Sequence, residues 1–432
     1  MGRLSGAGRA RRSLVAVTDP FRPVILGTDL GVYSMARSFH EACGVRSLVV
    51  SNSPRGPIND SRILDQVLVG RGATQEQTLE VLDRLPEQHS GSRLLLMVNS
   101  EHELGMIRAH RERLARGYVL PYPPNEVLAR GQDKAALAAV CQQLGVASPR
   151  TVGIALESLA TGSAGLEHAA ELRLPVVVKM AEAGDYLLRN FPGQRKVYAA
   201  QDRAELERIL RLLVAQGVTG EVLVQELIPG DDTASRVVTC YRDRAGRITA
   251  MASGQVLLGL HSPMLVGNGA AILTEPQPEL ETQAAAILEA LDYRGLANFD
   301  FRVDPRNGVA HVLDLNTRIG RSHYYANVAG VNPVRALVAD YAEELGYAED
   351  LPREEARAVG LYSYVPWTLL RRYLEPGLLD RVKVARRRRG LVHPLAYAAD
   401  RHPRRLAYRV AAAANLRRDF RRHYPAPTPT SF

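Results

Sequence analysis

The sequence lacks the features that mark membrane-spanning and zinc-binding proteins. No apolar run in its 432 residues reaches the length that crosses a bilayer. It contains only three cysteines, Cys43, Cys141 and Cys240, which are far apart and lie within apolar stretches. This spacing favours buried thiols and argues against a zinc cluster.

The N-terminus lacks the core of a signal peptide. Its apolar run Leu14–Val17 is too short, and Asp19 and Pro20 interrupt it. We therefore expect a cytoplasmic protein. Internal repeats and the fingerprint G-x-G-x-x-G are also absent, and without that fingerprint we expect no dinucleotide site.

The composition is that of an ordinary globular protein, but its charge is uneven. Hydrophobic residues make up 46% and charged residues 23%, and the length allows two or three domains. The net charge is +9. Between Arg381 and Arg422 there are 14 Lys or Arg and two Asp, a net of +12, so the remaining residues sum to −3. The basic character belongs to the tail.

The first 100 residues show the pattern of a doubly wound parallel sheet. A short apolar strand at 23–26 leads into the glycine turn 27–31 and a helical stretch at 32–42. Further strands are predicted at 47–50 and 94–98. The turn follows the carboxyl end of the first strand, where such sheets bind ligands. We expect either a structural glycine turn or a small-substrate pocket.

A predicted hairpin carries the clearest chemical signal. Alternation places Asp314, Asn316 and Arg318 on one face of a strand, and Asp300 on one face of the preceding strand. A tight turn at 304–308 would bring Asp300 and Asp314 face to face. Such a face is often merely solvated, but opposed carboxylates repel unless a cation lies between them. The pattern favours a divalent metal beside a phosphate.

Two lysines lie where an anionic partner is expected. Lys134 occupies the first turn of a predicted helix, where the helix dipole disfavours a cation, although a solvated lysine is the alternative. Lys179 is the single charge on the apolar strand 174–180 and needs a partner if buried. The polar stretch 191–198 is typical of a loop that closes over phosphates. Asp232 ends the strand and turn at 222–232, where a ribose could be held.

The order of these features resembles that of ATP-grasp ligases between Gly131 and about Leu345. The matching pieces are Lys134, Lys179 on V-V-V-K, the segment 225–232, Asp300 and the strand D-L-N-T-R at 314–318. Three further segments, at 24–40, 191–198 and 316–325, resemble the D-aspartate ligase type of carboxylate–amine ligase, as does the basic tail.

The resemblance implies an α/β fold of three parts. An N-terminal Rossmann-like domain is expected at 1–125, a two-lobed ATP-grasp domain at 126–350 with its lid at about 150–225, and a C-terminal extension with a basic helical tail at 351–432.

The resemblance also implies roles for individual residues. Lys134 and Lys179 would contact the ATP phosphates, and Asp232 would hold the ribose. The adenine slot would be lined by Gln225, Glu226 and Leu227. Asp300, Asp314 and Asn316 would hold Mg²⁺, or Mn²⁺ in its place. Lys179 and Arg318 would be catalytic, with Arg318 stabilising the transferring phosphoryl group. The chain departs from many relatives in having Asp rather than Glu at 314 and a glycine-poor loop at 182–186.

Five residues are candidates for substrate binding. Arg321 can hold a carboxylate or phosphate with two hydrogen bonds. The first glycine turn and the helix after it supply Asp29, Tyr33 and Arg37, and a second glycine turn at 265–269 supplies Asn268. Each of these four could equally be a helix cap or a surface residue.

The tail predicts a basic amphipathic helix at 404–422. Its apolar stripe would consist of Leu406, Val410, Ala413, Leu416 and Phe420, with arginines around the rest. An anionic membrane surface is one expected partner. The alternative is a helix that docks on the body of the protein through its stripe. No nucleic-acid module is recognisable, and no nucleic acid partner is expected.

The sequence thus predicts an ATP-dependent ligase that joins an amino-acid carboxylate to an amine. D-aspartate, or a similar acidic amino acid, and a peptidoglycan precursor of the nucleotide-sugar peptide type are the expected substrates. The alternatives are a ligase for a dipeptide or other small amide, and a non-catalytic nucleotide-binding protein that works through its tail. Oligomeric state and substrate identity stay open.

Overall fold

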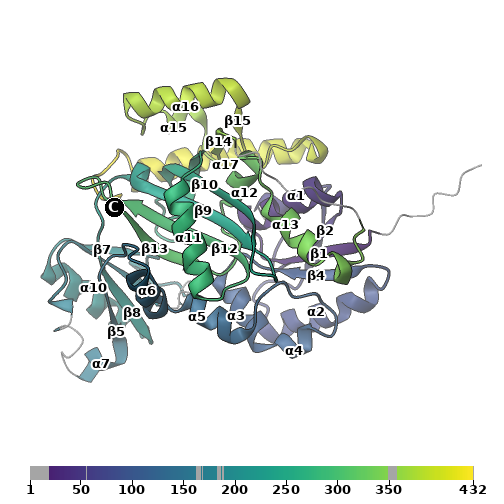
Figure 1. Cartoon of the computed structure of the whole chain (residues 1–432), viewed down its shortest axis with the longest axis horizontal. Helices are drawn as coiled ribbons and strands as arrows, with labels where there is room; N and C mark the ends of the chain where they lie inside the picture. The colour runs from purple at the N-terminus through teal and green to yellow at the C-terminus, as the bar shows by residue number, and fades with distance from the viewer. Residues whose placement is uncertain are drawn as a thin grey trace, which may run out of the picture.

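The computed structural model describes residues 19–431, except 55, 162–166, 168, 182–185, 187–188 and 349–357. These described residues form three sheets flanked by helices (Figure 1), and the predicted α/β class is confirmed. Most of the glycine-poor loop at 182–186 lies outside them. In the described part of the chain, no helix is long and apolar enough to cross a membrane.

The N-terminal sheet is parallel and has the strand order β3-β2-β1-β4. Its strands are β1 (Phe21–Leu26), β2 (Ser47–Ser51), β3 (Leu64–Leu68) and β4 (Arg93–Met97). The helices around it are α1 (Leu30–Cys43), α2 (Gln75–Gln88), α3 (Glu101–Ala109) and α4 (Arg111–Leu114). The strand order reverses between β1 and β4. Ligands of open α/β sheets bind at this point, outside the carboxyl ends of the strands.

The central sheet has seven strands in the order β13-β12-β9-β10-β11-β14-β15. They are β9 (Ser235–Arg242), β10 (Ile248–Gly259), β11 (Gly269–Thr274), β12 (Gly295–Val303), β13 (Ala310–Asn316), β14 (Gly360–Ser363) and β15 (Leu391–Val392). Its helices are α11 (Pro278–Ala290), α12 (Tyr324–Val328), α13 (Pro333–Asp340) and α14 (Ala342–Leu345).

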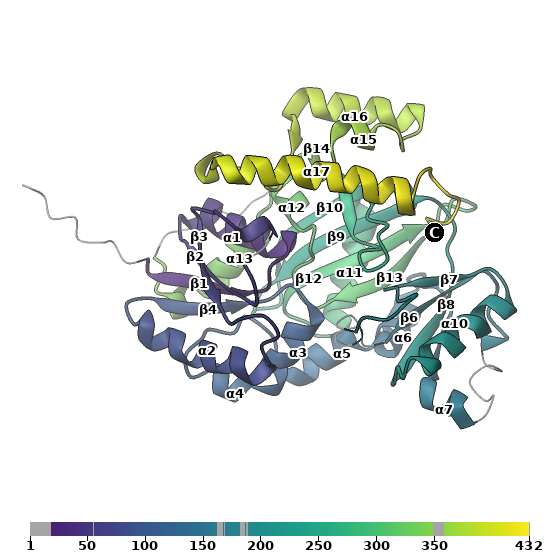
Figure 2. The same cartoon turned by 180° about the vertical axis from the view of Figure 1, so that it is seen from behind.

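A smaller sheet, β5-β8-β6-β7, lies at one end of the molecule with α10 against it (Figure 2). Its strands are β5 (Thr151–Ala155), β6 (Val176–Met180), β7 (Tyr198–Ala200) and β8 (Glu221–Glu226), with helices α7 (Leu156–Thr161) and α10 (Arg203–Ala215). Val176 and Val178 pack against Leu206 and Ile209 in a separate apolar core. The helices α5 (Asn125–Gln132) and α6 (Lys134–Gln143) connect the N-terminal sheet to this smaller sheet in the chain.

The C-terminal residues form α15 (Trp367–Leu370), α16 (Pro376–Arg389) and the long helix α17 (Pro403–His423), which runs across the molecule beneath α15 and α16 in Figure 2. The predicted apolar stripe of α17 is only partly correct. Leu416 and Phe420 are buried, but Leu406 is 60% and Val410 65% exposed. The N-terminal half of the helix therefore presents a different side to the body from the one predicted. Arg405 is buried there, and its Nη1 donates to the carbonyl oxygens of Pro57 and Asn59.

Candidate active site

The predicted hairpin of β12 and β13 has the expected register. Asp300 lies opposite Asp314, and Asn298 lies opposite Asn316. Gly308 adopts a positive φ of 74° in the connecting turn, a conformation that glycine tolerates. The Asn316 Nδ2 atom donates to Asp300 Oδ2 at 3.2 Å. The two carboxylates and the amide therefore gather on one face, as alternation predicted.

Lys134 reaches this face from the first turn of α6. Asp133 caps that helix, because its Oδ1 atom accepts hydrogen bonds from the backbone of Ala135 and Ala136 at 2.8 and 3.2 Å. The Lys134 ammonium forms an ion pair with Asp314. Burial lowers the pKa of Lys134 to about 8. The lysine that sequence placed against the helix dipole thus has a carboxylate partner.

Two more lysines lie near Asp300, Lys179 on β6 of the smaller sheet and Lys196 in the loop before β7. Burial, with the nearby charges of Lys134 and Lys196, lowers the pKa of Lys179 to about 7. Burial also lowers the pKa of Lys196, against the opposing effect of Asp300. Lys196 was not among the predicted site residues, and the only signal for it was its place in the polar loop 191–198. Three lysines converge where a polyphosphate would be neutralised.

Asp300 is the anion at the centre of this group. Burial raises its pKa, while the charges of Lys196 and Arg318 and the hydrogen bond from Asn316 oppose that rise. Among the described residues, no group of three or more His, Cys, Asp or Glu side chains could hold a metal by itself. Two carboxylates and an amide oxygen do suit Mg²⁺, which typically takes one or two carboxylates and completes its shell with water and substrate phosphates.

Arg318 follows β13, which ends at Asn316, and so it does not lie on the strand as predicted. Its Nη2 atom donates to Asn316 Oδ1 at 3.2 Å, and its Nε atom lies 2.8 Å from Glu101 Oε1. Glu101 begins α3 just beyond β4, and Gln132 Nε2 donates to its second oxygen at 2.6 Å. Glu101 was not among the predicted site residues. The guanidinium is thereby held beside the hairpin.

Asp29 and Arg321 meet at the point where the order of the parallel strands reverses. The Arg321 Nε atom donates to Asp29 Oδ2 at 2.9 Å. Asp29 Oδ1 accepts from Asn99 Nδ2 at 2.9 Å and caps α1 through the backbone of Val32. A Cβ atom on Gly31 would lie 2.2 Å from Asn99 Nδ2 and 3.0 Å from Arg321 Cα. Gly31 therefore permits the close approach that joins the two sheets here.

This geometry agrees with comparisons to known proteins. Residues 133–342 match the family described as "Carbamoyl-phosphate synthase L chain, ATP binding domain". The chain is 29% identical over 325 residues to a D-aspartate ligase from Enterococcus faecium, covering 74% of this chain and 77% of that protein. The family match begins next to Lys134 and includes the hairpin of β12 and β13. The chain contains an ATP-grasp domain.

Two solved structures share the ATP-grasp architecture. An N5-carboxyaminoimidazole ribonucleotide synthetase in complex with ADP superposes with a TM-score of 0.55 at 14% identity, covering 80% of this chain and 81% of the other. An L-amino acid ligase from Bacillus licheniformis gives 0.53 at 17% identity, with 79% and 78% covered. At these identities the two structures show a shared fold. The class of ATP-dependent ligase that forms a carbon–nitrogen bond rests on the sequence relatives.

The predicted adenine residues lie at the end of β8 in the ATP-grasp domain. The side chain of Gln225 donates to Thr151 Oγ1 at 2.9 Å, and the backbone of Leu227 donates to Pro175 at 3.0 Å. The Glu226 carboxylate accepts from Arg173, whose Nη2 atom lies 3.1 Å away. Burial alone would raise the pKa of Glu226, but these hydrogen bonds hold it below its usual value. The side chains of Gln225 and Glu226 thus bind other residues of the small sheet and its loops.

Asp232 is buried and is held by the chain itself. Its Oδ2 atom lies 2.7 Å from the backbone nitrogen of Gly259 and 2.8 Å from His261 Nε2. Burial raises its pKa, but these contacts outweigh burial and keep the pKa low. The predicted ribose ligand is therefore an ionised carboxylate that already has protein partners.

Three predicted substrate residues lie elsewhere. Tyr33 donates through its hydroxyl to Asp400 Oδ2 at 2.8 Å, and Arg37 Nη1 donates to the carbonyl oxygen of Pro394 at 2.8 Å. Asn268 Nδ2 donates within its own loop, to Leu265, at 2.8 Å. Their positions do not support substrate binding, because the C-terminal segment and the loop use these polar groups.

Proposed function

We propose that the chain activates the carboxylate of an acidic amino acid, D-aspartate or one similar to it, and couples it to an amine on a peptidoglycan precursor. The similarity to the D-aspartate ligase of Enterococcus faecium, which extends over 74% of this chain, supports the choice of substrates. The observation that carries the chemistry is the grouping of three lysines and Arg318 around Asp300, with Lys134 paired to the facing Asp314.

The reaction follows from the charges at this site. A carboxylate oxygen attacks the γ-phosphorus of ATP, the bond to the bridging oxygen breaks, and ADP leaves. The amine nitrogen then attacks the acyl phosphate, an amide forms, and phosphate leaves after the nitrogen loses a proton. Lys134, Lys179 and Lys196 neutralise the phosphate oxygens, and Arg318 stabilises the transferring group. Asp300, Asp314 and Asn316 would hold Mg²⁺, or Mn²⁺, which supplies further positive charge to the phosphates.

A ligase for dipeptides or other small amides is the second candidate. The architectural likeness to an L-amino acid ligase favours it. A non-catalytic nucleotide-binding protein would not need Asp300, Asp314, Asn316 and Arg318 together.

Release of ADP separates these functions. Purified full-length protein is assayed with ATP, Mg²⁺, a panel of D- and L-amino acids, and amine acceptors that include a nucleotide-linked muramyl pentapeptide. The proposal expects ADP release that requires an acidic amino acid and the pentapeptide, with the amide detected by mass spectrometry. Turnover only with small amines would favour the second candidate. Absence of amide under every condition would refute both.

We also propose that the exposed, arginine-rich side of α17 associates with anionic membrane surfaces. Leu406 and Val410 are large apolar side chains exposed on α17, a helix rich in arginine. Apolar contact and positive charge together are typical of peripheral binding to anionic lipid.

A further inference from the structure

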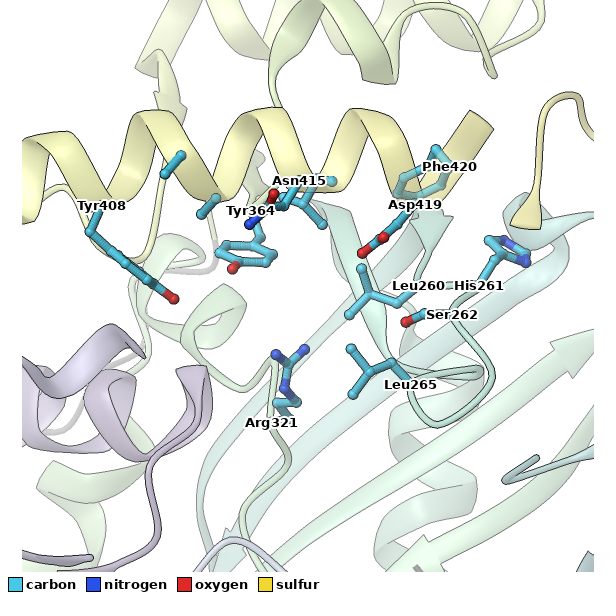
Figure 3. A pocket seen from close by; sticks show the side chains of 13 residues that line it. Leu260, His261, Ser262, Leu265, Arg321, Tyr364, Tyr408, Asn415, Asp419 and Phe420 are labelled. Carbon is cyan, nitrogen blue, oxygen red and sulfur yellow. The ribbon is translucent and has the colours of Figure 1, made fainter. Parts of the chain in front are cut away.

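A cavity of about 350 Å³ lies between Arg321, the loop at 260–265 and helix α17 (Figure 3). Small-molecule sites measure about 300–1,000 Å³, so the cavity suits an amino acid better than a whole nucleotide-linked peptide. Its walls are largely apolar, with Leu260, Leu265 and Phe420 among them. Helix α17 lies outside residues 133–342, the part that matches the ATP-binding family.

The cavity adjoins the phosphate-binding lysines. Pro263, in the loop beside it, accepts a hydrogen bond from the backbone of Lys196 at 2.9 Å. Burial lowers the pKa of Lys196 most, Asp300 opposes this effect, and the charges of Arg318 and Arg321 lower the pKa further. A substrate in the cavity would therefore lie beside the group that activates it.

Opposite charges face the cavity from its two sides. Figure 3 shows the Arg321 guanidinium pointing into it from below, and the side chains of Asn415 and Asp419 pointing down from α17. Asp419 is the single acidic residue of α17, which contains seven arginines. Even so, within the described chain no hydrogen bond or ion pair engages its carboxylate. Arg321 uses its Nε atom for Asp29, which leaves the outer guanidinium nitrogens for a ligand.

We propose that this cavity binds the amino-acid substrate as a zwitterion, with its α-carboxylate at Arg321 and its α-ammonium at Asp419. The inference rests on the proposed function and deepens it, since it assigns one wall of the substrate site to the C-terminal helix. Asp419 binds and orients the substrate through its ammonium group. The apolar walls limit the size of the amino acid that fits.

Binding of amino acids to the full-length protein tests this assignment. Calorimetric titration with D-aspartate, L-aspartate and succinate, which lacks the amino group, is performed on the parent and on Asp419→Asn. We expect Asp419→Asn to weaken binding of the preferred aspartate about 10- to 100-fold, the range for loss of one charged hydrogen bond. Succinate, which has no ammonium group for Asp419 to hold, should lose no affinity in Asp419→Asn, and Asp419→Glu should recover part of the affinity for aspartate.

Asp380→Asn is the matched control, because Asp380 is an exposed carboxylate on α16 and pairs with Lys383. Equal affinities of Asp419→Asn and Asp380→Asn for aspartate would overturn the inference, as would failure of the parent to bind either aspartate. If the parent binds aspartate through Asp419 but forms no amide with any acceptor, the proposed function fails while the zwitterion site stands.

Discussion

Lys179 is a lysine whose charge depends on its ligand. Its pKa of about 7 arises from burial and from the neighbouring cations Lys134 and Lys196. At pH 8 it is therefore mostly neutral in the free protein. A triphosphate favours the charged form, so the pKa should rise when ATP binds and the site should take up a proton.

We expect ATP binding at pH 8 to take up about one proton through Lys179, with a further share from Lys134. Below pH 6 both lysines are already charged, and the uptake should vanish. Calorimetry in buffers of different ionisation enthalpy measures it. Lys179→Met should reduce the uptake and weaken ATP binding, whereas Lys383→Met on exposed α16 should change neither. Uptake unchanged in Lys179→Met would show that Lys179 does not contact the phosphates.

The facing carboxylates give a second prediction for single residues. Asp300→Asn and Asp314→Asn should each lower kcat at least about 100-fold, because each removes a charged oxygen from the proposed metal and phosphate site. Asp304→Asn, in the turn of the same hairpin, removes the ion pair with Arg306 instead. It should lower the melting temperature and keep the turnover. Asp300→Asn and Asp314→Asn variants that release ADP at the parental rate would refute the assigned site.

The facing pair could be predicted because strand alternation and a tight turn allow few registers. That Lys134 has an anionic partner could also be predicted, because Lys134 lies in the first turn of a helix, where the dipole disfavours a cation. The structure identifies Asp314 as that partner. Glu101 and Lys196 could not be singled out, because a loop and a helix start place them by tertiary packing alone. Tyr33 and its partner Asp400 are 367 residues apart, and no local pattern in α1 reports such a contact.

At the scale of elements, α17 shows what amphipathic patterning can and cannot predict. The spacing of its apolar residues correctly predicted a helix. The same pattern wrongly predicted that Leu406 and Val410 face the body, whereas Arg405 does so. Arg405 is buried because the carbonyl oxygens of Pro57 and Asn59 and the carboxylate of Asp400 satisfy its guanidinium. An arginine with such partners can occupy a buried position that a hydrophobicity scale would give to leucine.

The contact between α1 and the C-terminal segment yields a prediction about Tyr33. Tyr33→Phe removes its hydroxyl from Asp400 and should lower the free energy of unfolding by about 1.5–3 kcal/mol, the contribution of a hydrogen bond to a charged group. The KM for the amino acid should not change, because Tyr33 does not reach the cavity. Chemical denaturation and steady-state kinetics measure the two effects. A large rise in KM with unchanged stability would restore Tyr33 as a substrate residue.

At the scale of the whole molecule, the C-terminal segment fastens three regions together. Asp400 holds α1, Tyr424 stacks on His261 with ring centroids 3.5 Å apart, and Pro429 accepts a hydrogen bond from Gly230 at 2.7 Å. Removing the tail would expose the core and open the cavity beside Arg321. Deletion is therefore a poor test of membrane binding, and substitution of exposed side chains is the better one.

The double variant Leu406→Ser, Val410→Ser should sediment less with vesicles that contain phosphatidylglycerol, while turnover in solution stays at the parental level. Both side chains are exposed, so their loss removes apolar contact with lipid without altering the core. Leu68→Ser with Val309→Ser removes two exposed apolar side chains elsewhere and should leave sedimentation unchanged. The parent and both double variants should fail to sediment with neutral phosphatidylcholine vesicles. If the parent also fails to sediment with the anionic vesicles, the proposed membrane association of α17 is wrong.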